Sequence, residues 1–191
     1  MAKVHYSAIA LLAIAGFVLQ LLIAGVDVSW TWLKAVSASL AIVGGGIFVF
    51  DHYLWRVGWL YGKFHHRPNL RGTWDVTFHS NFDDGSGQPV VRVGTMRIDQ
   101  TFFSLDVFVE TAESEGHIVA REFVGLGKDQ PRLVATYRNE PRASVRGRSP
   151  MHYGTMTLNC DAPHSRPETL HGNYWTDRET TGQLEATRRA D

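Results

Sequence analysis

The chain of 191 residues carries 19 basic and 19 acidic side chains, which gives a formal net charge of zero. This neutrality argues against a sequence-independent binder of long nucleic acid, because such proteins gain their affinity from a basic surface that releases counterions. With a single cysteine, Cys160, no intrachain disulfide can form, and nothing in the sequence requires an oxidising compartment.

The apolar residues are concentrated near the N-terminus. Residues 7–26 run for 20 positions without a charged side chain, and a helix of that length spans about 30 Å, the thickness of the hydrocarbon layer of a bilayer. A second apolar stretch at 35–50 is extended on both sides by aromatic residues that favour the membrane interface. We therefore predict a transmembrane hairpin over residues 1–55, with helices at about 7–26 and 33–55.

The positions of the basic residues predict the orientation of this hairpin. The connection at 27–31 is too short for a domain and contains no Lys or Arg, so both flanks of the hairpin lie on one side of the membrane. Lys3 precedes the hairpin, and four basic residues follow it within 56–71. The positive-inside rule then predicts a multi-pass protein of the cell inner membrane with both termini in the cytoplasm.

Two features of this region have alternative interpretations. A cleaved signal peptide ending near Ala24 would remove the first helix, and the second would still anchor the chain with its C-terminal side inward. Small residues such as the run Gly44–Gly46 let helix backbones approach closely, which favours either self-association or packing of the two helices of one chain.

After a juxtamembrane linker at 56–67, the pattern of the sequence changes. We interpret the pair His65–His66 in this linker as solvated at the membrane interface. From 68 to 191, short alternating runs are separated by Gly, Pro, Asn and Asp, which is typical of a β-meander. Hairpin turns are predicted at Asp84–Gly87 and Glu115–Gly116. About eight strands are predicted, at 70–79, 90–101, 103–113, 117–127, 132–139, 151–160, 168–177 and 181–188.

The alternation indicates that each strand buries one face, as Trp74, Val76 and Phe78 do between polar neighbours. Because no helix is predicted to cover a sheet here, the strands are best satisfied by closing on themselves, which removes unpaired edges. The predicted fold class is therefore membrane-anchored all-β: two N-terminal transmembrane helices followed by a compact eight-stranded antiparallel up-and-down β-barrel, lipocalin-like and cytosolic, over 68–191. A barrel of this size encloses its own side chains or one small ligand.

No catalytic signature is present. The sequence has no nucleophile elbow with a Ser-His-Asp set, no phosphate-binding glycine loop before a helix and no zinc-like spacing of Cys and His. We therefore predict a protein that is not an enzyme and that uses no metal and no cofactor.

The densest polar and aromatic segment is 172–178. If it is a strand, Tyr174, Thr176 and Arg178 share one face, and Trp175 lies on the other. A ring, a hydroxyl and a guanidinium on one face can stack on a base, donate a hydrogen bond and bind a phosphate. The alternative is a closing hairpin with Trp175 in the core.

A second candidate is the fifth strand, where Tyr137 and Asn139 share a face near one mouth of the barrel. Arg121 either points inward as a phosphate partner or, paired with Glu122 or at the surface, has a structural role. The arginines of the loop at 141–150 are interpreted as solvated.

The order of several short motifs along the chain resembles one family. Two apolar N-terminal segments and a linker ending near Pro68 precede the opening Leu70-x-Gly72-x-Trp74 and the closing Gly172-x-Tyr174-Trp175-Thr176-Asp177-Arg178-x-Thr180-x-Gly182. This arrangement resembles the two-transmembrane, β-strand-rich effectors of CBASS anti-phage defence.

The resemblance implies a barrel that binds a cyclic dinucleotide made by a partner nucleotidyltransferase upon phage infection. Binding is expected to promote homo-oligomerisation, after which the clustered helices disrupt the lipid bilayer of the inner membrane and arrest growth of the infected cell. The ligand-binding set that the resemblance implies is Tyr137, Asn139, Tyr174, Thr176, Arg121, Arg138 and Arg178.

Two other functions remain open. The chain is alternatively a membrane-tethered, lipocalin-like carrier or sensor of a small hydrophobic ligand. A third hypothesis is a structural or assembly subunit whose barrel is filled by its own side chains and binds no ligand.

Overall fold

The computed structural model describes residues 6–23, 25, 30–82, 90–126, 131–160 and 166–190. The chain divides into two compact units, Met1–Leu54 and Trp55–Asp191, which are described separately. The first unit contains the helices α1 (Tyr6–Ile23) and α2 (Trp30–His52).

The prediction of two transmembrane helices is wrong. In the part of the chain that the structure describes, neither helix combines the length and the apolar character that a membrane crossing requires. α1 has 18 residues, whereas a crossing takes about 20. α2 has 23 residues, but it contains the charged residues Lys34 and Asp51, and its serines and the run Gly44–Gly46 lower its apolar content.

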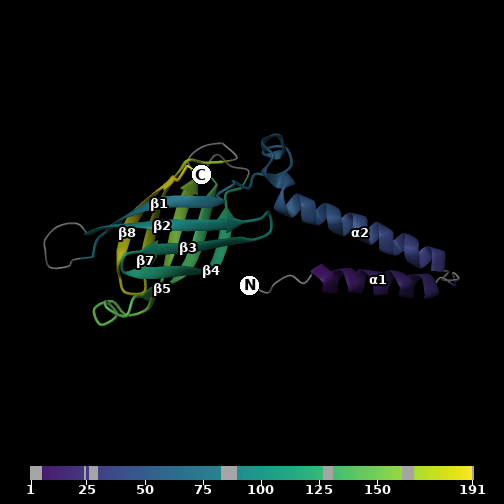
Figure 1. The fold of residues 1–191 in the computed structure, drawn as a ribbon, viewed down its shortest axis with the longest axis horizontal. Coiled ribbons are helices and arrows are strands. Elements are labelled where there is room, and N and C mark those ends of the chain that lie inside the picture. The colour runs from purple at the N-terminus through teal and green to yellow at the C-terminus, as the bar shows by residue number, and fades with distance from the viewer. Residues whose placement is uncertain are drawn as a thin grey trace. The chain divides into compact units, whose positions relative to one another are not determined.

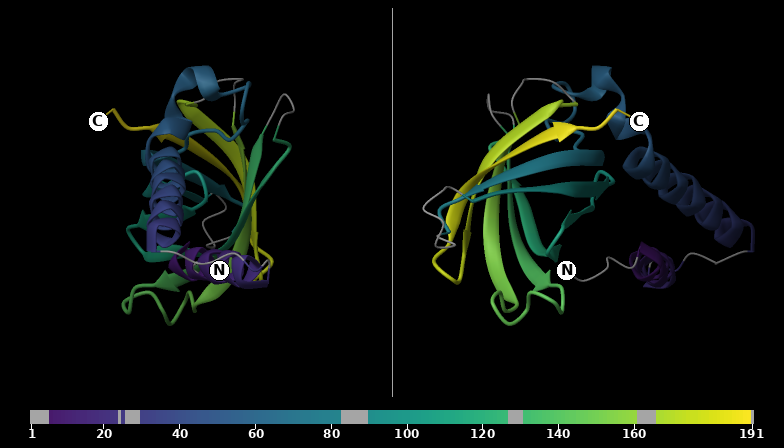
Figure 2. Two further views of the ribbon diagram at one scale, coloured as in Figure 1. Left: turned by 90° about the vertical axis from the view of Figure 1, so that its right-hand side faces the viewer. Right: turned by 60° about the vertical axis from the view of Figure 1, so that its left-hand side comes forward.

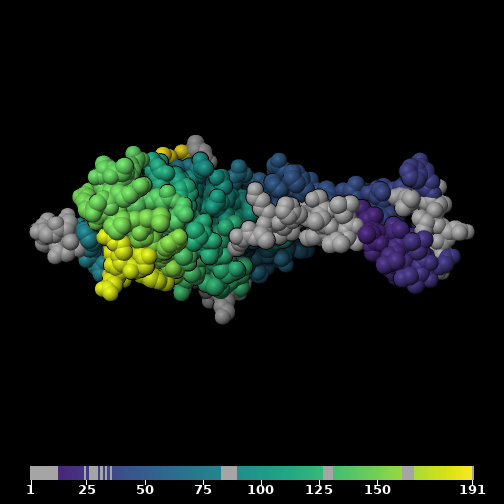
Figure 3. Space-filling view, turned by 90° about the horizontal axis from the view of Figure 1, so that it is seen from below, coloured from purple at the N-terminus to yellow at the C-terminus, as the bar shows by residue number. Residues whose placement is uncertain are grey.

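The second unit is a closed antiparallel barrel in which each strand pairs with its neighbours along the chain and β8 pairs with β1 (Figure 1). The predicted eight-stranded up-and-down barrel is thus observed. Its strands are β1 (Gly72–Ser80), β2 (Val90–Gln100), β3 (Leu105–Thr111), β4 (Ser114–Val124), β5 (Arg132–Pro141), β6 (His152–Cys160), β7 (Thr169–Thr176) and β8 (Thr181–Arg188). Figure 2 shows the strands wrapping around one interior, and Figure 3 shows the C-terminal strands, green to yellow, packed together on the outer surface.

The interior of the barrel has two halves along its axis, one filled by apolar side chains and one that contains a pocket. In β1, Trp74 and Val76 are fully buried in one half, whereas Phe78 and Ser80 line a pocket in the other half. Each of the other strands likewise runs from the filled half to the open half or in the reverse direction, because neighbouring strands are antiparallel. The filled half consists of the side chains of Leu70, Trp74, Val76, Met96, Ile98, Leu105, Val107, Phe123, Leu133, Ala135, Leu158, Cys160, Leu170, Leu184 and Ala186.

A buried arginine, Arg188, connects backbone segments at the filled end of the barrel. The Arg188 side chain, 3% exposed, lies 4.2 Å from the centroid of the Trp74 ring. Its guanidinium donates hydrogen bonds to the backbone carbonyls of Pro167, Asn69 and Arg71. These bonds tie the end of β8 to the segment that precedes β1.

Residues 55–70, here called the strap, pack against the barrel through aromatic contacts. His65 is 8% exposed, so the interpretation that it is solvated is wrong. Its Nε2–H donates to the carbonyl of Trp55 at 2.8 Å, and its Nδ1 accepts from the backbone N–H of Arg67 at 3.3 Å. Burial lowers the pKa of His65, and the nearby His66 and Arg67 charges lower it further against the opposing effect of the Trp55 hydrogen bond.

The seam between β3 and β4 is the shortest ladder in the barrel. It consists of three residue pairs, at Phe108–Glu110 of β3, and β4 shifts register between Ile118 and Ala120. The predicted turn at Glu115–Gly116 is wrong, because both residues lie inside β4 and the chain turns between Thr111 and Ser114. The predicted turn at Asp84–Gly87 lies outside the described residues.

Candidate ligand-binding site

The open half of the barrel contains a pocket of about 230 Å³. All eight strands or the loops at their ends contribute to it, so the pocket exists only because the sheet closes. The described lining residues are Phe78, Ser80, Phe82, Val90, Arg92, Val109, Thr111, Glu113, Ser114, Gly116, Ile118, Tyr137, Asn139, Pro141, Val145, Arg148, Ser149, His152, Met156, Tyr174, Thr176, Arg178 and Thr180.

Two glycines hold the two pocket tyrosines in place. Tyr137 pairs with Gly154 across β5 and β6, and Tyr174 pairs with Gly182 across β7 and β8. A Cβ atom at Gly154 would lie 2.5 Å from the Tyr137 ring, and a Cβ atom at Gly182 would lie 2.6 Å from the Tyr174 ring. Each ring therefore lies directly over a backbone that has no side chain, an arrangement that fixes aromatic residues within a sheet.

The aromatic residues form the inner wall of the pocket. The rings of Phe78 and Tyr174 meet edge to face, with centroids 5.8 Å apart and an interplanar angle of 84°. Burial raises the pKa of the Tyr137 hydroxyl well above its usual range, and the charges of Tyr174 and Asp177 act in the same direction. The hydroxyl of Tyr137 consequently stays protonated and is able to donate a hydrogen bond into the cavity.

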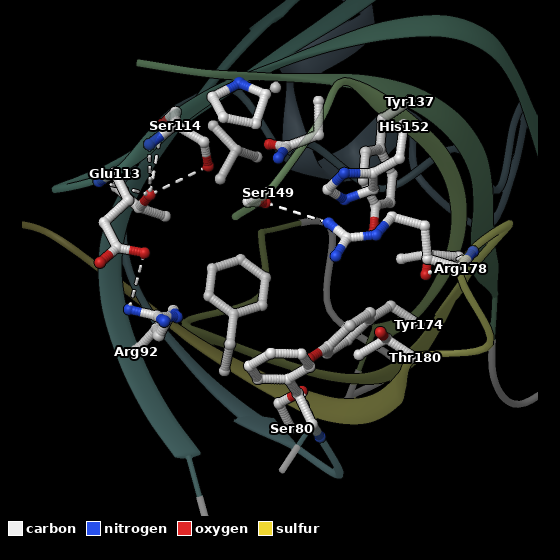
Figure 4. Close-up of a pocket in the computed structure, with 18 of the residues that line it drawn as sticks. Ser80, Arg92, Glu113, Ser114, Tyr137, Ser149, His152, Tyr174, Arg178 and Thr180 are labelled. Atoms are coloured by element: carbon white, nitrogen blue, oxygen red, sulfur yellow. Dashed lines mark hydrogen bonds and ion pairs between the residues drawn. The ribbon is translucent and has the colours of Figure 1, made fainter. Parts of the chain in front are cut away.

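Charged side chains stand on two opposite walls of the pocket (Figure 4). On one wall, Arg92 Nη1 lies 3.1 Å from Glu113 Oε2, and Arg148 binds the other oxygen of the same carboxylate. On the other wall, Arg178 donates to Ser149 Oγ at 3.1 Å, close to His152. The described lining residues thus include three arginines and one glutamate, a formal charge of +2 with neutral histidine.

This arrangement can accommodate a ligand with two separate anionic groups and flat rings between them. Arginine binds phosphate through charge-assisted hydrogen bonds, and aromatic faces stack on nucleobases. A purely apolar ligand would leave the net charge of +2 in the lining without a matching group.

Residues 65–188, which contain all eight strands, match the family model described as Cap15, cyclic dinucleotide receptor domain. The chain belongs to this family. The curated protein named CD-NTase-associated protein 15 from Staphylococcus schleiferi is 24% identical over 155 residues, which cover 80% of this chain and 78% of that protein. The protein of the same name from Yersinia aleksiciae is 29% identical over 175 residues, which cover 82% of this chain and 78% of that protein. The resemblance to CBASS effectors is confirmed.

The Cap15 barrel brings together five of the seven residues that sequence analysis selected. Tyr137, Asn139, Tyr174, Thr176 and Arg178 all line the pocket. Their role in ligand binding stays a prediction.

The structure does not bring Arg121 and Arg138 into the pocket. Arg138 follows Tyr137 directly along β5, so it points outward, where it pairs with Glu140. Arg121 pairs in register with Ala135, which belongs to the filled half, and it does not reach the pocket lining. The alternative that placed Trp175 in the core is wrong, because this side chain is 46% exposed on the outer face of the barrel.

Sequence analysis missed the arginines and the glutamate that face Arg178 in this Cap15 pocket. Arg92 interrupts an apolar run of β2 at an inward position, which is a readable signal for a functional arginine. Arg148 is 66% exposed in the β5–β6 loop, so its interpretation as solvated is confirmed, but the sequence did not indicate that it also lines the pocket. Glu113 gave no signal, because it lies in a turn whose position was predicted wrongly.

Proposed function

We propose that the chain binds a cyclic dinucleotide in the open half of its barrel and that this ligand is its activating signal. The observation that carries the proposal is the pair of arginine-bearing walls on opposite sides of an aromatic pocket (Figure 4). A cyclic dinucleotide has two phosphodiesters and two bases, so its charge of about −2 matches the lining charge. Stacking of each base on an aromatic ring contributes about 1–3 kcal/mol.

The chain acts in this proposal as a receptor and not as an enzyme. The messenger is made by a partner nucleotidyltransferase, and the barrel itself supplies no chemical step and requires no cofactor. Tyr137 and Tyr174 contact the bases, Thr176 and Asn139 hydrogen-bond to the ligand, and Arg178 binds one phosphate. Each of these side chains lines the pocket from β5, β7 or the loop that follows β7.

The test is calorimetric titration of the purified full chain in detergent with a panel of cyclic dinucleotides. Arg178→Ala should weaken binding about tenfold or more, because a hydrogen bond to a charged group contributes about 1.5–3 kcal/mol. Arg138→Ala is the matched control, since it removes the same charge from the outer face of the barrel. Its affinity should stay within twofold of that of the original chain.

The competing functions predict different results in the same titration. Binding of a fatty acid without binding of any cyclic dinucleotide would support the hydrophobic carrier and overturn the proposal. Binding of neither class would support the structural subunit. If Arg178→Ala and Arg138→Ala lose the same affinity for the cyclic dinucleotide, the ligand does not bind in this pocket.

We further propose that ligand binding promotes self-association and that the N-terminal unit then disrupts the inner membrane. Large apolar side chains of α2 are exposed, including Ile42, Val43, Ile47 and Phe48, and such a surface requires a partner or lipid to cover it. The experiment is release of a dye from vesicles of bacterial lipids that carry the full chain, measured together with light scattering. Dye release that is independent of the cyclic dinucleotide would overturn this step.

The proposed location is the cytoplasmic side of the inner membrane, where a cytoplasmic messenger reaches the barrel. Cys160 is the single cysteine of the sequence and is buried, so no disulfide within the chain calls for an oxidising compartment. A reporter protein that is active only in the cytoplasm, fused to the C-terminus, checks the location. Activity of a periplasm-specific reporter at the same position would contradict it.

A further inference from the structure

Glu113 is an unexpected residue in a pocket proposed to bind an anion. Its side chain is 30% exposed and lines the cavity from the turn between β3 and β4. Both carboxylate oxygens are engaged, Oε2 by Arg92 and Oε1 by Arg148. The two arginines of this wall are therefore already neutralised in part by a group of the protein itself.

The shape of this ion pair corresponds to the shape of a phosphate site. A carboxylate presents two oxygens to the two guanidinium groups, and a phosphodiester presents two non-bridging oxygens in a similar way. The Glu113 carboxylate thus has the position and the chemistry that one ligand phosphate would need between Arg92 and Arg148.

We propose that Glu113 is an internal competitor that sets the affinity and the charge selectivity of the pocket: a ligand phosphate binds Arg92 and Arg148 by displacing its carboxylate. This inference rests on the proposed function and goes beyond it by assigning the second phosphate of the ligand to this wall. Arg178 on the opposite wall binds the first phosphate without such competition, because its contact there is the neutral hydroxyl of Ser149.

The connection of the β5–β6 loop to this wall does not depend on the carboxylate alone. The backbone N–H of Arg142 donates to the carbonyl oxygen of Glu113 at 2.8 Å, and the Arg142 side chain pairs with Glu110 at 2.8 Å. Displacement of the carboxylate therefore leaves the loop attached through Arg142. The exchange changes the charges that face the cavity while it preserves the wall that carries them.

The test compares Glu113→Gln with Glu110→Gln in calorimetric titrations of the full chain with the cyclic dinucleotide panel. Both substitutions remove one negative charge from the same hairpin and keep the shape of the side chain, but Glu110 does not line the pocket. Glu113→Gln should bind about fivefold more tightly, which corresponds to the ~1 kcal/mol that one like charge at about 4 Å costs even at the dielectric constant of water. Glu110→Gln should bind within twofold of the original chain. Guanosine and adenosine, which lack phosphate, should show no gain with either variant.

The sign of the effect decides the matter. Loss of a pocket side chain normally weakens binding, so tighter binding by Glu113→Gln, reduced by added salt, supports the inference. Unchanged or weaker binding by a Glu113→Gln variant that melts within 2 °C of the original chain overturns it, as does an equal gain with Glu110→Gln. If Glu113→Gln has a lower melting temperature, its affinity is measured below the melting transition. Tighter binding then supports the inference, and unchanged or weaker binding overturns it. Absence of binding by both the original chain and the variant would overturn the proposed function as well, which distinguishes the two failures.

Discussion

Replacement of Arg188 tests how the filled end of the barrel is held together. The guanidinium donates to three backbone carbonyls, of Pro167, Asn69 and Arg71, and lies over the Trp74 ring. A carboxylate, that of Glu168, lies 3.9 Å away and is itself largely exposed. Backbone hydrogen bonds and the ring contact, more than ion pairing, therefore stabilise this buried charge.

The structure allows the cost of two substitutions to be ranked. Arg188→Met keeps much of the apolar contact with Trp74 but leaves three carbonyls without their donor, at about 1 kcal/mol each. The substitution also removes a buried charge, and the desolvation penalty of that charge is then no longer incurred on folding. The net loss in the free energy of unfolding is therefore about 2 kcal/mol. Arg188→Lys keeps the charge and cannot reach three carbonyls from one ammonium group, so its loss is larger, about 3 kcal/mol.

Differential scanning calorimetry and chemical denaturation of the full chain measure both variants. For a unit of this size, about 2–3 kcal/mol lowers the melting temperature of the barrel by about 5–15 °C. Cyclic dinucleotide affinity, measured well below the transition, should stay within twofold, because Arg188 lies at the end away from the pocket. A melting temperature within 1 °C of the original for both variants, or a more stable Lys variant than Met variant, would refute the reasoning.

Three further predictions concern the strap and the pocket. Burial lowers the pKa of His65, so the unfolded chain takes up a proton that the folded chain does not as the pH falls below about 6.5, and stability is lost in that range. His65→Gln should reduce this loss between pH 7 and pH 5 in denaturation curves, and an unchanged slope would contradict the assignment. Gly154→Ala should displace the Tyr137 ring and weaken cyclic dinucleotide binding about tenfold in calorimetry, whereas Gly147→Ala, whose added Cβ meets nothing within 4 Å, should not. Tyr137→Phe should weaken binding about fivefold with little change in melting temperature, because it removes one neutral hydrogen-bond donor; unchanged affinity would exclude its hydroxyl from ligand recognition.

Period-two alternation predicted which residues of one strand share a face, and it did so correctly in two places. Tyr137 with Asn139, and Tyr174 with Thr176, line the pocket together. The same rule excludes Arg138, because neighbours along a strand point to opposite faces of the sheet. That arginine entered the predicted set from the family resemblance, and the periodicity of its own strand contradicts it.

Height along the barrel axis could not be predicted in the same way. Arg121 occupies a position in register with Ala135 and lies at the level of the filled half. Its level depends on the stagger between strands and on the register shift after Ile118, and neither is encoded in the alternation of one strand. Closure of the sheet likewise determines that Arg92 faces Arg178 across the cavity, although the two are far apart in sequence.

The helical unit shows a different limit of sequence analysis. Counting uncharged positions in 7–26 predicted a helix of sufficient length, but α1 ends at Ile23, which leaves 18 residues. Aromatic residues near 50–55 extended the second predicted helix, whereas α2 ends at His52, and Leu54–Arg56 and Gly58–Leu60 form separate 3-10 turns. Composition indicated apolar helices, but where a helix ends depends on local backbone hydrogen bonds that composition does not specify.

The division of the barrel into a filled half and an open half separates stability from binding. Apolar side chains of the filled half hold the eight strands together, so the open half can keep polar and charged groups around a cavity without collapsing.

The strap packs beside the filled end, through His65 and the Phe102 ring, while the pocket opens at the other end. The longest strands, β2 and β4, have 11 residues each, which corresponds to about 25 Å along the axis of a barrel with tilted strands. A ligand in the pocket is thus too far from the strap to touch it, and any effect of binding on the strap has to pass through the strands. The β3–β4 seam has the fewest residue pairs, three, and Glu113 lies in the turn at one end of it. Beyond the other end of this seam β4 continues to Phe123, whose ring centroid lies 4.9 Å from the guanidinium of the strap residue Arg67, so β4 connects the pocket wall to the strap.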